Sequence, residues 1–529
     1  MPDQASAGLQ VEADVLVIGG GLAATWAAVG AAEAGAQVVL ADKGWCGASG
    51  VTATAGPGHW WVAPAERAAA IDKQLERARG LGDPDWMARV LDLTWRSLPR
   101  LAAYYDFPRD EAGEPRYRAL RGPEYLRGMR RMALDLGVRI LDHCPALELL
   151  QHRDGSIAGA AGLRRQQGES WTARAGAVVL ATGGCAFGSR LLGADVDTGD
   201  GLLMGAEAGV ELSGMEFTSY YTVAPAGSNM TRSVSYAFAS YRDAAGTPLD
   251  IPAGDATRPL ARAMLQGPVF CRLDRMPEAF RERLHLIQPS VLMALNRSGI
   301  DPFEDWFEVT LRGEGTIRGV GGLKVDDRDC QTRTPGLFVA GDTASREPVA
   351  GAVSGGGAVN SAWAVSSGQW AGAGAALLAR RHGRRSGEAA RPLGQAGLRP
   401  TSSSGGIDAR ETIRAVGAEL LAYDRNIFRR GDRLAQSLSR LEGLWSDVAA
   451  RLGGEGRARL KAREAAAITA AGRWSYAAAL ARAESRGLHQ RDDAPSEAQA
   501  FGGRISVGGL DHPWTRLETP PLAVRETAA

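Results

Sequence analysis

Residues 14–24 read DVLVIGGGLAA, an apolar run that ends in three glycines. This pattern predicts a buried strand that turns directly into a helix. Gly19 permits the tight turn, Gly21 removes a side chain that would block a diphosphate, and Ala24 lets the helix pack closely on the strand. Asp42 closes the next predicted strand about 20 residues later, where its carboxylate can accept hydrogen bonds from a ribose. Together these features predict a bound dinucleotide.

Length and charge limit the classes of protein to which this chain can belong. A chain of 529 residues predicts about three domains and a core large enough for a cofactor. The 61 basic and 60 acidic residues nearly cancel, so nothing favours a nucleic acid or an acidic membrane as partner. No run reaches the ~18 apolar residues of a membrane span, and the start at Met1 lacks a signal-peptide pattern. We therefore expect a cytoplasmic protein.

The cysteines and histidines do not form a metal-binding pattern. Five cysteines are scattered without Cys-x-x-Cys spacing, so the chain cannot supply the thiolates of an iron–sulfur cluster, and any such cluster would belong to a partner. We expect these thiols to be buried and reduced. The seven histidines are equally dispersed and predict no metal site. The 68 glycines are about twice the ~7% average, as expected where the backbone must approach a ligand.

The order of strand-like and helix-like segments predicts an α/β fold with a Rossmann-like domain. Short β-branched runs alternate with alanine-rich segments from residue 11 to about 230, which is typical of a mostly parallel sheet covered on both faces. Residues 177–184 (AVVLATGG) and 336–342 (GLFVAGD) are further apolar strands that end in glycine. Because this pattern stops after residue 230 and resumes later, the dinucleotide domain is predicted to be discontinuous.

The expected domain boundaries follow from these changes of pattern. We predict a dinucleotide-binding domain at 10–230 and 317–383, an α+β insertion at 231–316, a Gly/Pro/Ser-rich linker at 384–406, and a helical domain with a Pro-containing tail at 407–529. Asp408 resembles the N-cap of the first helix of that last domain.

Several motifs occur together along the chain. They are TGDG at 198–201, MEF at 215–217, GD at 341–342 and ESRGLH at 484–489. With the N-terminal glycine turn, this combination resembles the fumarate reductase and succinate dehydrogenase flavoprotein family, which also includes L-aspartate oxidase and the adenylylsulfate reductase flavoprotein. The resemblance covers nearly the whole chain. It implies bound FAD, a mobile capping domain inserted into the FAD-binding domain, and a C-terminal helical domain.

The same resemblance implies which residues hold FAD. They come from the glycine turn, the ribose-binding acid, the segment along the isoalloxazine, the adenine side and two later strand ends: Gly19, Gly20, Gly21, Ala24, Asp42, Lys43, Ser49, Gly50, Thr52, Ala146, Ala181, Thr182, Gly183, Asp200, Gly341, Asp342, Ala358 and Val359. Ordinary turn chemistry is the alternative for Asp200 and Asp342. Ser49 stands where complex-bound members attach FAD through a histidine, so we expect noncovalent FAD.

The substrate side departs from the family pattern. Tyr221 and Ile317 occupy the positions of two substrate-side histidines, and Val353 occupies that of the substrate arginine. Each charge-assisted hydrogen bond lost in this way removes on the order of 1.5–3 kcal/mol of binding free energy. The sequence therefore predicts a substrate other than succinate or fumarate.

Two residues are candidates for proton transfer. Arg258 begins RPLARAM, which resembles the family's arginine motif with one residue deleted, and Tyr221 carries a phenol that can donate or accept a proton. A surface ion pair for Arg258 and simple packing for Tyr221 are the alternatives. Trp60 and Trp61 either contribute to an aromatic wall of the cavity or belong to the core. For ESRGLH, helix capping and interdomain contacts are favoured over catalysis.

These observations favour an FAD-dependent oxidoreductase that moves a hydride between flavin N5 and a C–C or C–N bond of a small substrate. One alternative is an electron-transferring subunit that works with a separate iron–sulfur protein, as in adenylylsulfate reductase. A free enzyme reoxidised by oxygen, on the L-aspartate oxidase side of the family, is another. A flavin-binding protein without turnover is the third.

Overall fold

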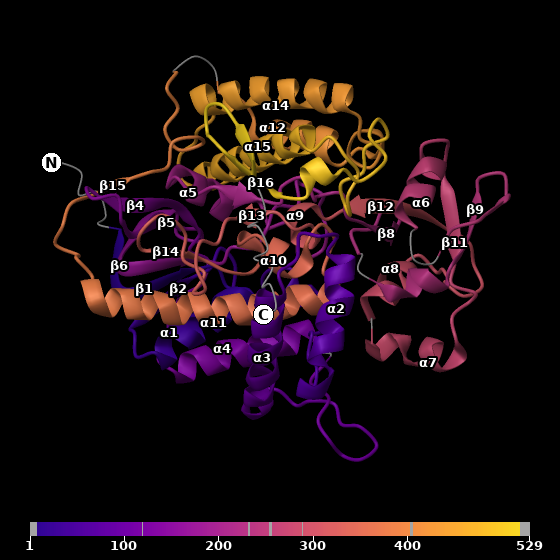
Figure 1. The fold of residues 1–529 in the computed structure, drawn as a ribbon, viewed down its shortest axis with the longest axis horizontal. Helices are drawn as coiled ribbons and strands as arrows, with labels where there is room; N and C mark the ends of the chain where they lie inside the picture. The colour runs from indigo at the N-terminus through magenta and orange to yellow at the C-terminus, as the bar shows by residue number, and fades with distance from the viewer. Residues whose placement is uncertain are drawn as a thin grey trace, which may run out of the picture.

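The computed structural model describes residues 8–118, 120–230, 233–252, 256–287, 289–402 and 406–518. The first residues, from which the absence of a signal peptide was predicted, and the end of the predicted tail lie outside this part of the chain. Figure 1 shows a central sheet domain, the C-terminal helices along its upper side, and a smaller domain at the right. This arrangement confirms the predicted fold class.

The central sheet has eight strands and is mixed. Its order is β15-β4-β5-β6-β1-β2-β3, and β14 pairs with β6. The β1 strand is parallel to β2 and β6, while β4, β5 and β6 are antiparallel neighbours. The strands are β1 (Leu9–Ile18), β2 (Val38–Ala41), β3 (Arg139–Leu141), β4 (Ala146–His152), β5 (Ile157–Arg164), β6 (Glu169–Leu180), β14 (Leu337–Val339) and β15 (Ala390–Pro392).

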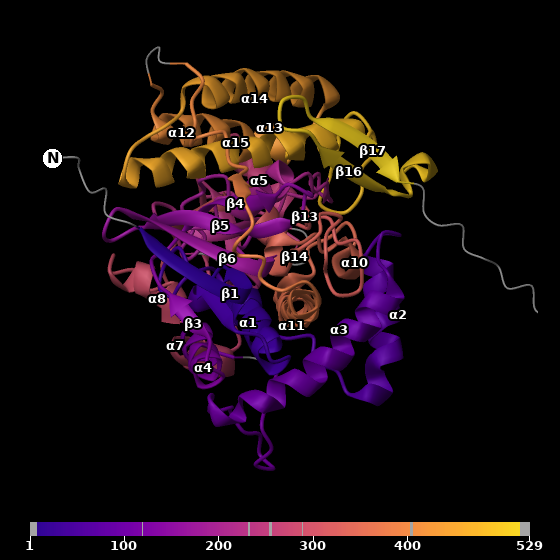
Figure 2. The same cartoon turned by 90° about the vertical axis from the view of Figure 1, so that its left-hand side faces the viewer.

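Two apolar helices pack together beside this sheet (Figure 2). They are α1 (Leu22–Glu33) and α11 (Gly356–His382), and most of their side chains are buried. Their backbones approach very closely, because a Cβ at Gly372 would lie 2.0 Å from the carbonyl oxygen of Ala27. The glycine-rich composition therefore serves helix packing as well as ligand approach. The remaining helices of this part are α2 (Arg67–Arg77), α3 (Pro84–Ser97), α4 (Gly122–Asp135), α5 (Asp200–Glu207), α9 (Gly315–Arg318) and α10 (Glu347–Ala350).

The inserted domain is α+β, as predicted, and has a core of its own. Its sheet has the order β10-β9-β11-β12-β8. The elements are β8 (Tyr221–Pro225), β9 (Ser240–Asp243), β10 (Pro248–Leu249), α6 (Thr257–Met264), β11 (Val269–Arg272), α7 (Glu278–Ile287), α8 (Pro289–Asn296) and β12 (Phe307–Gly313). The predicted start at residue 231 is too late, because β8 pairs with β12 and therefore belongs to this sheet.

The C-terminal part contains α12 (Ala409–Leu420), α13 (Tyr423–Asn426), α14 (Gly431–Arg451) and α15 (Arg457–Ala481). As predicted, the Asp408 side chain caps α12 by accepting hydrogen bonds from two backbone N–H groups. The expected tail instead contains a hairpin of β16 (Arg504–Gly508) and β17 (Trp514–Glu518), which joins β7 (Leu212–Ser213) and β13 (Gly322–Leu323) in a third sheet. Likewise, the predicted linker contains β15, which pairs with β4.

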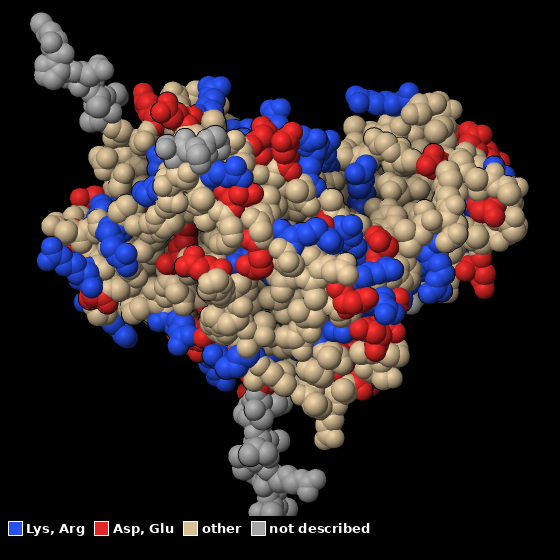
Figure 3. All heavy atoms as spheres, turned by 90° about the horizontal axis from the view of Figure 1, so that it is seen from above, with Lys and Arg blue, Asp and Glu red and all other residues tan. Residues whose placement is uncertain are grey.

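Among the helices in the described ranges, none is both long enough and apolar enough to cross a bilayer. On the face seen in Figure 3, basic and acidic side chains are interspersed, and neither sign covers an extended area. This distribution agrees with a net charge of +1.

Buried Glu347, on α10, couples the stability of this structure to pH. Its Oε2 accepts a hydrogen bond from Ser213, while its Oε1 is buried without a partner. Burial raises the pKa of Glu347 to about 7, with a further contribution from the nearby Glu216 carboxylate. Because the pKa is higher in the folded chain than in the unfolded one, the stabilisation is present below about pH 4.5 and is lost as the pH rises through 7.

We therefore expect Glu347→Gln, which cannot ionise, to gain stability relative to the wild type as the pH rises. The gain should approach about 3 kcal/mol between pH 4.5 and pH 8, because each unit of pKa corresponds to about 1.4 kcal/mol. Urea unfolding of both proteins across this range measures it. A difference in the free energy of unfolding that stays constant with pH would contradict the prediction.

Candidate functional site

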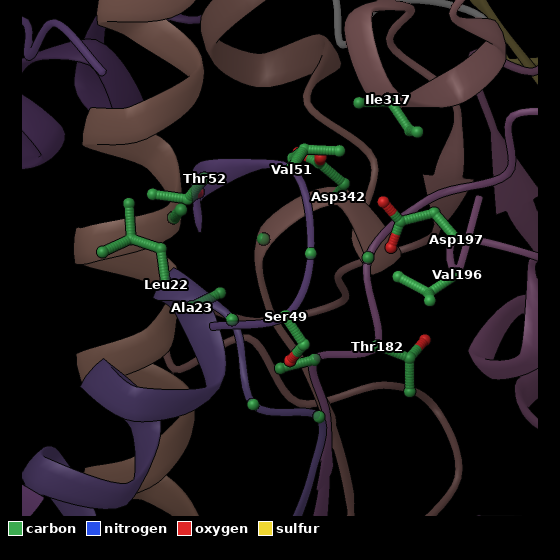
Figure 4. A pocket seen from close by; sticks show the side chains of 18 of the residues that line it. Leu22, Ala23, Ser49, Val51, Thr52, Thr182, Val196, Asp197, Ile317 and Asp342 are labelled. Atoms are coloured by element: carbon green, nitrogen blue, oxygen red, sulfur yellow. The ribbon is translucent and has the colours of Figure 1, made fainter. Parts of the chain in front are cut away.

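A cavity opens where β1 turns into α1, at the carboxyl ends of the parallel strands (Figure 4). It is lined by the turn itself, the ends of β2 and β6, the 49–57 segment, the start of α5, α9 and the first turns of α11. The lining residues are Ile18, Gly19, Gly20, Gly21, Leu22, Ala23, Ala41, Asp42, Lys43, Gly44, Ser49, Gly50, Val51, Thr52, Ala55, Gly56, Pro57, Pro145, Ala146, Ala181, Thr182, Gly183, Val196, Asp197, Asp200, Met204, Ile317, Arg318, Gly341, Asp342, Gly357, Asn360, Ser361 and Ala364.

The three glycines of the turn have different physical roles. Gly19 has a φ of +124°, and a Cβ there would lie 2.1 Å from the carbonyl oxygen of Ala181. A Cβ at Gly20 would lie 2.3 Å from the Asp42 carboxylate. A Cβ at Gly21 would meet no protein atom within 4 Å and would instead enter the cavity. Gly19 and Gly20 are therefore required by the fold, whereas Gly21 keeps space open at the N-terminus of α1.

Asp42 lies beside this turn, directly after β2. It is 5% exposed, and its Oδ2 accepts a hydrogen bond of 2.5 Å from the Ser49 hydroxyl. Burial raises the pKa of the Asp42 carboxyl, while this hydrogen bond lowers it. The structure therefore brings the predicted ribose ligand and Ser49 together at the edge of the cavity.

Lys43 is neutralised by carboxylates from two different domains. Its Nζ lies 2.5 Å from Asp200 and 3.1 Å from Glu464 of α15, and it donates a hydrogen bond to Thr198. Burial alone would lower the pKa of Lys43, but the two carboxylates raise it above its ordinary value. Lys43 thus attaches the C-terminal domain to the cavity wall, and Asp200 has a charge partner as well as a place in a helical turn.

The cavity has the features that an adenine dinucleotide requires. It offers open space at Gly21 and at Gly357, where a Cβ would likewise meet nothing within 4 Å. Both amide atoms of the Asn360 side chain are buried without a hydrogen-bond partner in the protein. A buried amide without partners costs free energy, so a ligand that pairs with it is expected. The first N–H groups of α1 have no acceptor within the helix and suit a diphosphate.

Most of the predicted FAD-contacting residues lie in this cavity lining, but Ala24, Ala358 and Val359 do not. Ala24 is fully buried in α1. The Ala358 carbonyl accepts a hydrogen bond from the backbone of Trp60, and the neighbouring Val359 is buried. The positions implied by the family resemblance therefore did not include Gly357, Asn360 and Ser361, which line the cavity from α11. The sequence signal that could have identified them is the occurrence of an asparagine and a serine in the otherwise apolar first turns of this helix.

The two residues proposed for proton transfer lie outside the cavity. Tyr221 donates a hydrogen bond to the carbonyl of Leu421 and accepts one of 3.0 Å from Asn426, and burial raises the pKa of its phenol. Arg258 forms an ion pair of 2.6 Å with Asp492. Both residues therefore join the inserted domain to the C-terminal domain, which corresponds to the packing and ion-pair alternatives.

Other candidate motifs have structural contacts. Trp61 stacks on Trp95 with ring centroids 3.8 Å apart, and both Trp60 and Trp61 pack against the main core. His489 of the ESRGLH motif is fully buried, with one ring nitrogen 2.7 Å from the Arg429 guanidinium. These contacts agree with the core and interdomain interpretations.

Comparisons with known proteins identify the family to which this chain belongs. A model described as "FAD binding domain" matches residues 91–233, and one described as "Fumarate reductase flavoprotein C-term" matches residues 418–509. An L-aspartate oxidase of Streptomyces coelicolor is 27% identical, with 92% of this chain and 89% of that protein covered. The chain belongs to the fumarate reductase and succinate dehydrogenase flavoprotein family. It is an FAD-dependent oxidoreductase of that family.

Solved structures show how far the fold of this flavoprotein is shared. The chain superimposes on a mutated quinol fumarate reductase FrdA of E. coli with a TM-score of 0.80 at 21% identity, over 96% of both chains. It superimposes on an adenosine-5-phosphosulfate reductase in complex with sulfite with a TM-score of 0.75 at 17% identity, also over 96% of both chains. At these identities the likeness establishes the fold alone.

Proposed function

We propose that this flavoprotein transfers a hydride between N5 of a noncovalently bound FAD and a C–C or C–N bond of a small substrate that is not a dicarboxylate. The observation that supports it best is the extent of the cavity. It reaches from the glycine turn and Asp42 to Ile317 and Arg318, close to the junction with the inserted domain. One cavity thus offers room for a dinucleotide at one end and for a substrate at the other.

Noncovalent attachment is supported by the lining of the cavity. Ser49, which stands at the predicted attachment position, donates its hydroxyl hydrogen to Asp42. None of the lining residues that the structure describes is a histidine. The nearby His59 is buried, and its Nε2 lies 3.4 Å from the Tyr125 hydroxyl.

A dicarboxylate would lack its partners in this cavity. Ile317 contributes an apolar side chain to the lining, while Tyr221 and Val353 do not reach it. Two carboxylates need two sets of charge-assisted donors to offset their desolvation. Aspartate is also a dicarboxylate, so we do not extend the activity of the L-aspartate oxidase relatives to this chain.

Bound FAD supplies the hydride chemistry at N5 of its ring. The protein's part is to hold the diphosphate at the N-terminus of α1, the ribose at Asp42, and the substrate beside Ile317 and Arg318. The inserted domain excludes water when it closes on the cavity. Arg258 and Tyr221 remain predictions as proton-transfer groups, and to act they would have to move from their present contacts.

The second candidate is electron transfer to a separate iron–sulfur protein. All five cysteines are buried and unpaired with one another, and the described residues contain no cluster of metal-ligating side chains. An iron–sulfur cluster in such a system would therefore come from the partner. The free thiols of this chain are typical of a reducing compartment. We therefore propose that the protein acts in the cytoplasm, whichever of the two candidate reactions it performs.

An absorbance spectrum before and after acid precipitation tests the proposal. Flavin bands that move to the supernatant are the expected result, since Ser49 provides no attachment point. Colour that stays with the pellet would overturn the noncovalent assignment, and a protein purified without flavin would overturn the function.

Anaerobic reduction followed by mixing with candidate oxidants then separates the alternatives. The proposal predicts fastest reoxidation by an unsaturated acid or an imine. Fastest reoxidation by an iron–sulfur protein would favour the second candidate. Reoxidation by oxygen alone would favour a free oxidase, and slow reoxidation by every acceptor would indicate a flavin-binding protein without turnover.

A further inference from the structure

Arg318 differs from the other basic residue of the cavity in having no carboxylate partner. Of the lining residues that the structure describes, Lys43 and Arg318 are basic. Lys43 is held between Asp200 and Glu464. No ion pair of Arg318 occurs among the described residues, and its Nε is buried without a hydrogen-bond partner. The lining thus presents one guanidinium whose charge the protein does not neutralise through direct contact.

Two contacts with Tyr220 hold this guanidinium in place. Its Nη2 donates a hydrogen bond of 2.9 Å to the Tyr220 hydroxyl, and its central carbon lies 4.7 Å from the centroid of the Tyr220 ring. These contacts occupy one nitrogen and one face of the guanidinium. Because an arginine carries five N–H donors, the others remain for a ligand. The order already imposed on the side chain lowers the entropic cost of binding.

The backbone on both sides of Arg318 is also fixed. Buried Arg346 donates through Nη2 to the carbonyls of Thr316, Ile317 and Gly319, and its other terminal nitrogen pairs with Asp342. Asp342 itself lines the cavity. The fully buried Arg346 thus fixes the backbone of the short helix α9 and thereby positions Arg318.

The position of this helix separates Arg318 from the diphosphate region. Figure 4 shows Ile317, the residue before it, on the opposite side of the cavity from Ala23 and Ser49. The diphosphate is expected at the N-terminus of α1, which begins beside Ala23. Arg318 therefore lies where the substrate, rather than the cofactor phosphates, needs a positive partner.

We propose that Arg318 is the specificity-determining residue for the substrate and binds a single anionic oxygen group, either a carboxylate or a sulfonate, while Tyr220 holds its guanidinium in place. This inference rests on the proposed function and adds the class of substrate, a monoanion. One unneutralised guanidinium satisfies one such group and leaves a second without a partner. Arg346 is the positioning residue.

The test uses the full chain loaded with FAD, and benzoate, benzenesulfonate, acetate and neutral benzamide as probes. Each probe is titrated while the absorbance bands of bound FAD are followed. We expect at least one anion to give a saturable spectral change, and benzamide to give none. The benzoate and benzenesulfonate titrations distinguish a carboxylate site from a sulfonate site, and saturation by either supports the proposal.

Arg318→Gln should lower the affinity for the anion by roughly 10–100-fold, the range expected for loss of hydrogen bonds from a charged donor. Arg318→Lys keeps the charge but loses the forked geometry, so its affinity should be intermediate. The matched control is Arg272→Gln, which removes a partly exposed arginine paired with Asp274 on the inserted domain and should leave anion affinity unchanged.

FAD affinity, measured by fluorescence titration, distinguishes a failure of the proposed function from a failure of the Arg318 inference. It should change less than about threefold in Arg318→Gln, because the diphosphate and ribose contacts are intact. If the wild type binds no FAD, the proposed function fails and this inference fails with it. If FAD binds normally but the anions bind equally well to wild type and Arg318→Gln, or to neither, this inference alone is overturned.

Discussion

Gly21→Val is expected to abolish FAD binding while the protein remains folded. Gly21 precedes α1 with a φ of −81°, which any residue can adopt, and a Cβ there meets no protein atom within 4 Å. The added side chain would occupy the open space in which we propose that the diphosphate binds. Overpacking of this kind costs about 1–3 kcal/mol, and lost N–H contacts add to it, so we expect roughly a 100-fold or greater loss of affinity. Fluorescence titration with FAD measures this loss.

The matched control is the same substitution two residues earlier. Gly19→Val places a Cβ 2.1 Å from the Ala181 carbonyl oxygen at a φ of +124°, so the protein itself should be destabilised. The thermal midpoint without FAD should therefore fall in Gly19→Val and stay close to that of the wild type in Gly21→Val. An FAD affinity in Gly21→Val equal to that of the wild type would contradict binding of the diphosphate at this turn.

Arg482→Met is expected to produce the largest loss of stability among these variants. Arg482 is fully buried between Glu216, at 2.7 Å, and Glu484, at 2.9 Å, and both carboxylates are fully buried as well. Removing the cation leaves the buried Glu216 carboxylate without its ion-pair partner, whereas Glu484 keeps its ion pair with Arg486. Breaking a buried ion pair in this way typically costs about 3–5 kcal/mol. The Arg482–Glu216 ion pair also joins the 215–217 segment to the C-terminal part. Urea unfolding should show the decrease in the free energy of unfolding.

A surface arginine provides the comparison. Arg385 pairs with Asp154 and Glu388, but its side chain is 29% exposed and its partners are about half exposed. Arg385→Met should therefore lower the free energy of unfolding by at most about 1 kcal/mol. Equal losses in the two variants would show that burial does not set the cost of removing an arginine here.

Local patterns succeeded where the interacting residues are neighbours in sequence. The strand, glycine turn and helix of residues 14–24 form one continuous unit, so spacing alone was sufficient to predict it. The Asp408 cap depends on N–H groups only two and three residues away and was equally predictable. The limit of the inserted domain was not, because Tyr221 pairs with Gly313 across a long separation in sequence. The β15 strand in the predicted linker was missed for the same reason.

The sequence by itself determined the fold class and the FAD-binding family, because both depend on short motifs whose residues act through local geometry. Only the tertiary structure decided which polar side chains reach the cavity. It placed Asn360 and Arg318 in the lining, and it directed Tyr221 and Arg258 toward the C-terminal domain. The physical reason is that the direction of a side chain depends on strand register and on the domain packed against it, and both are set by contacts between residues far apart in the chain.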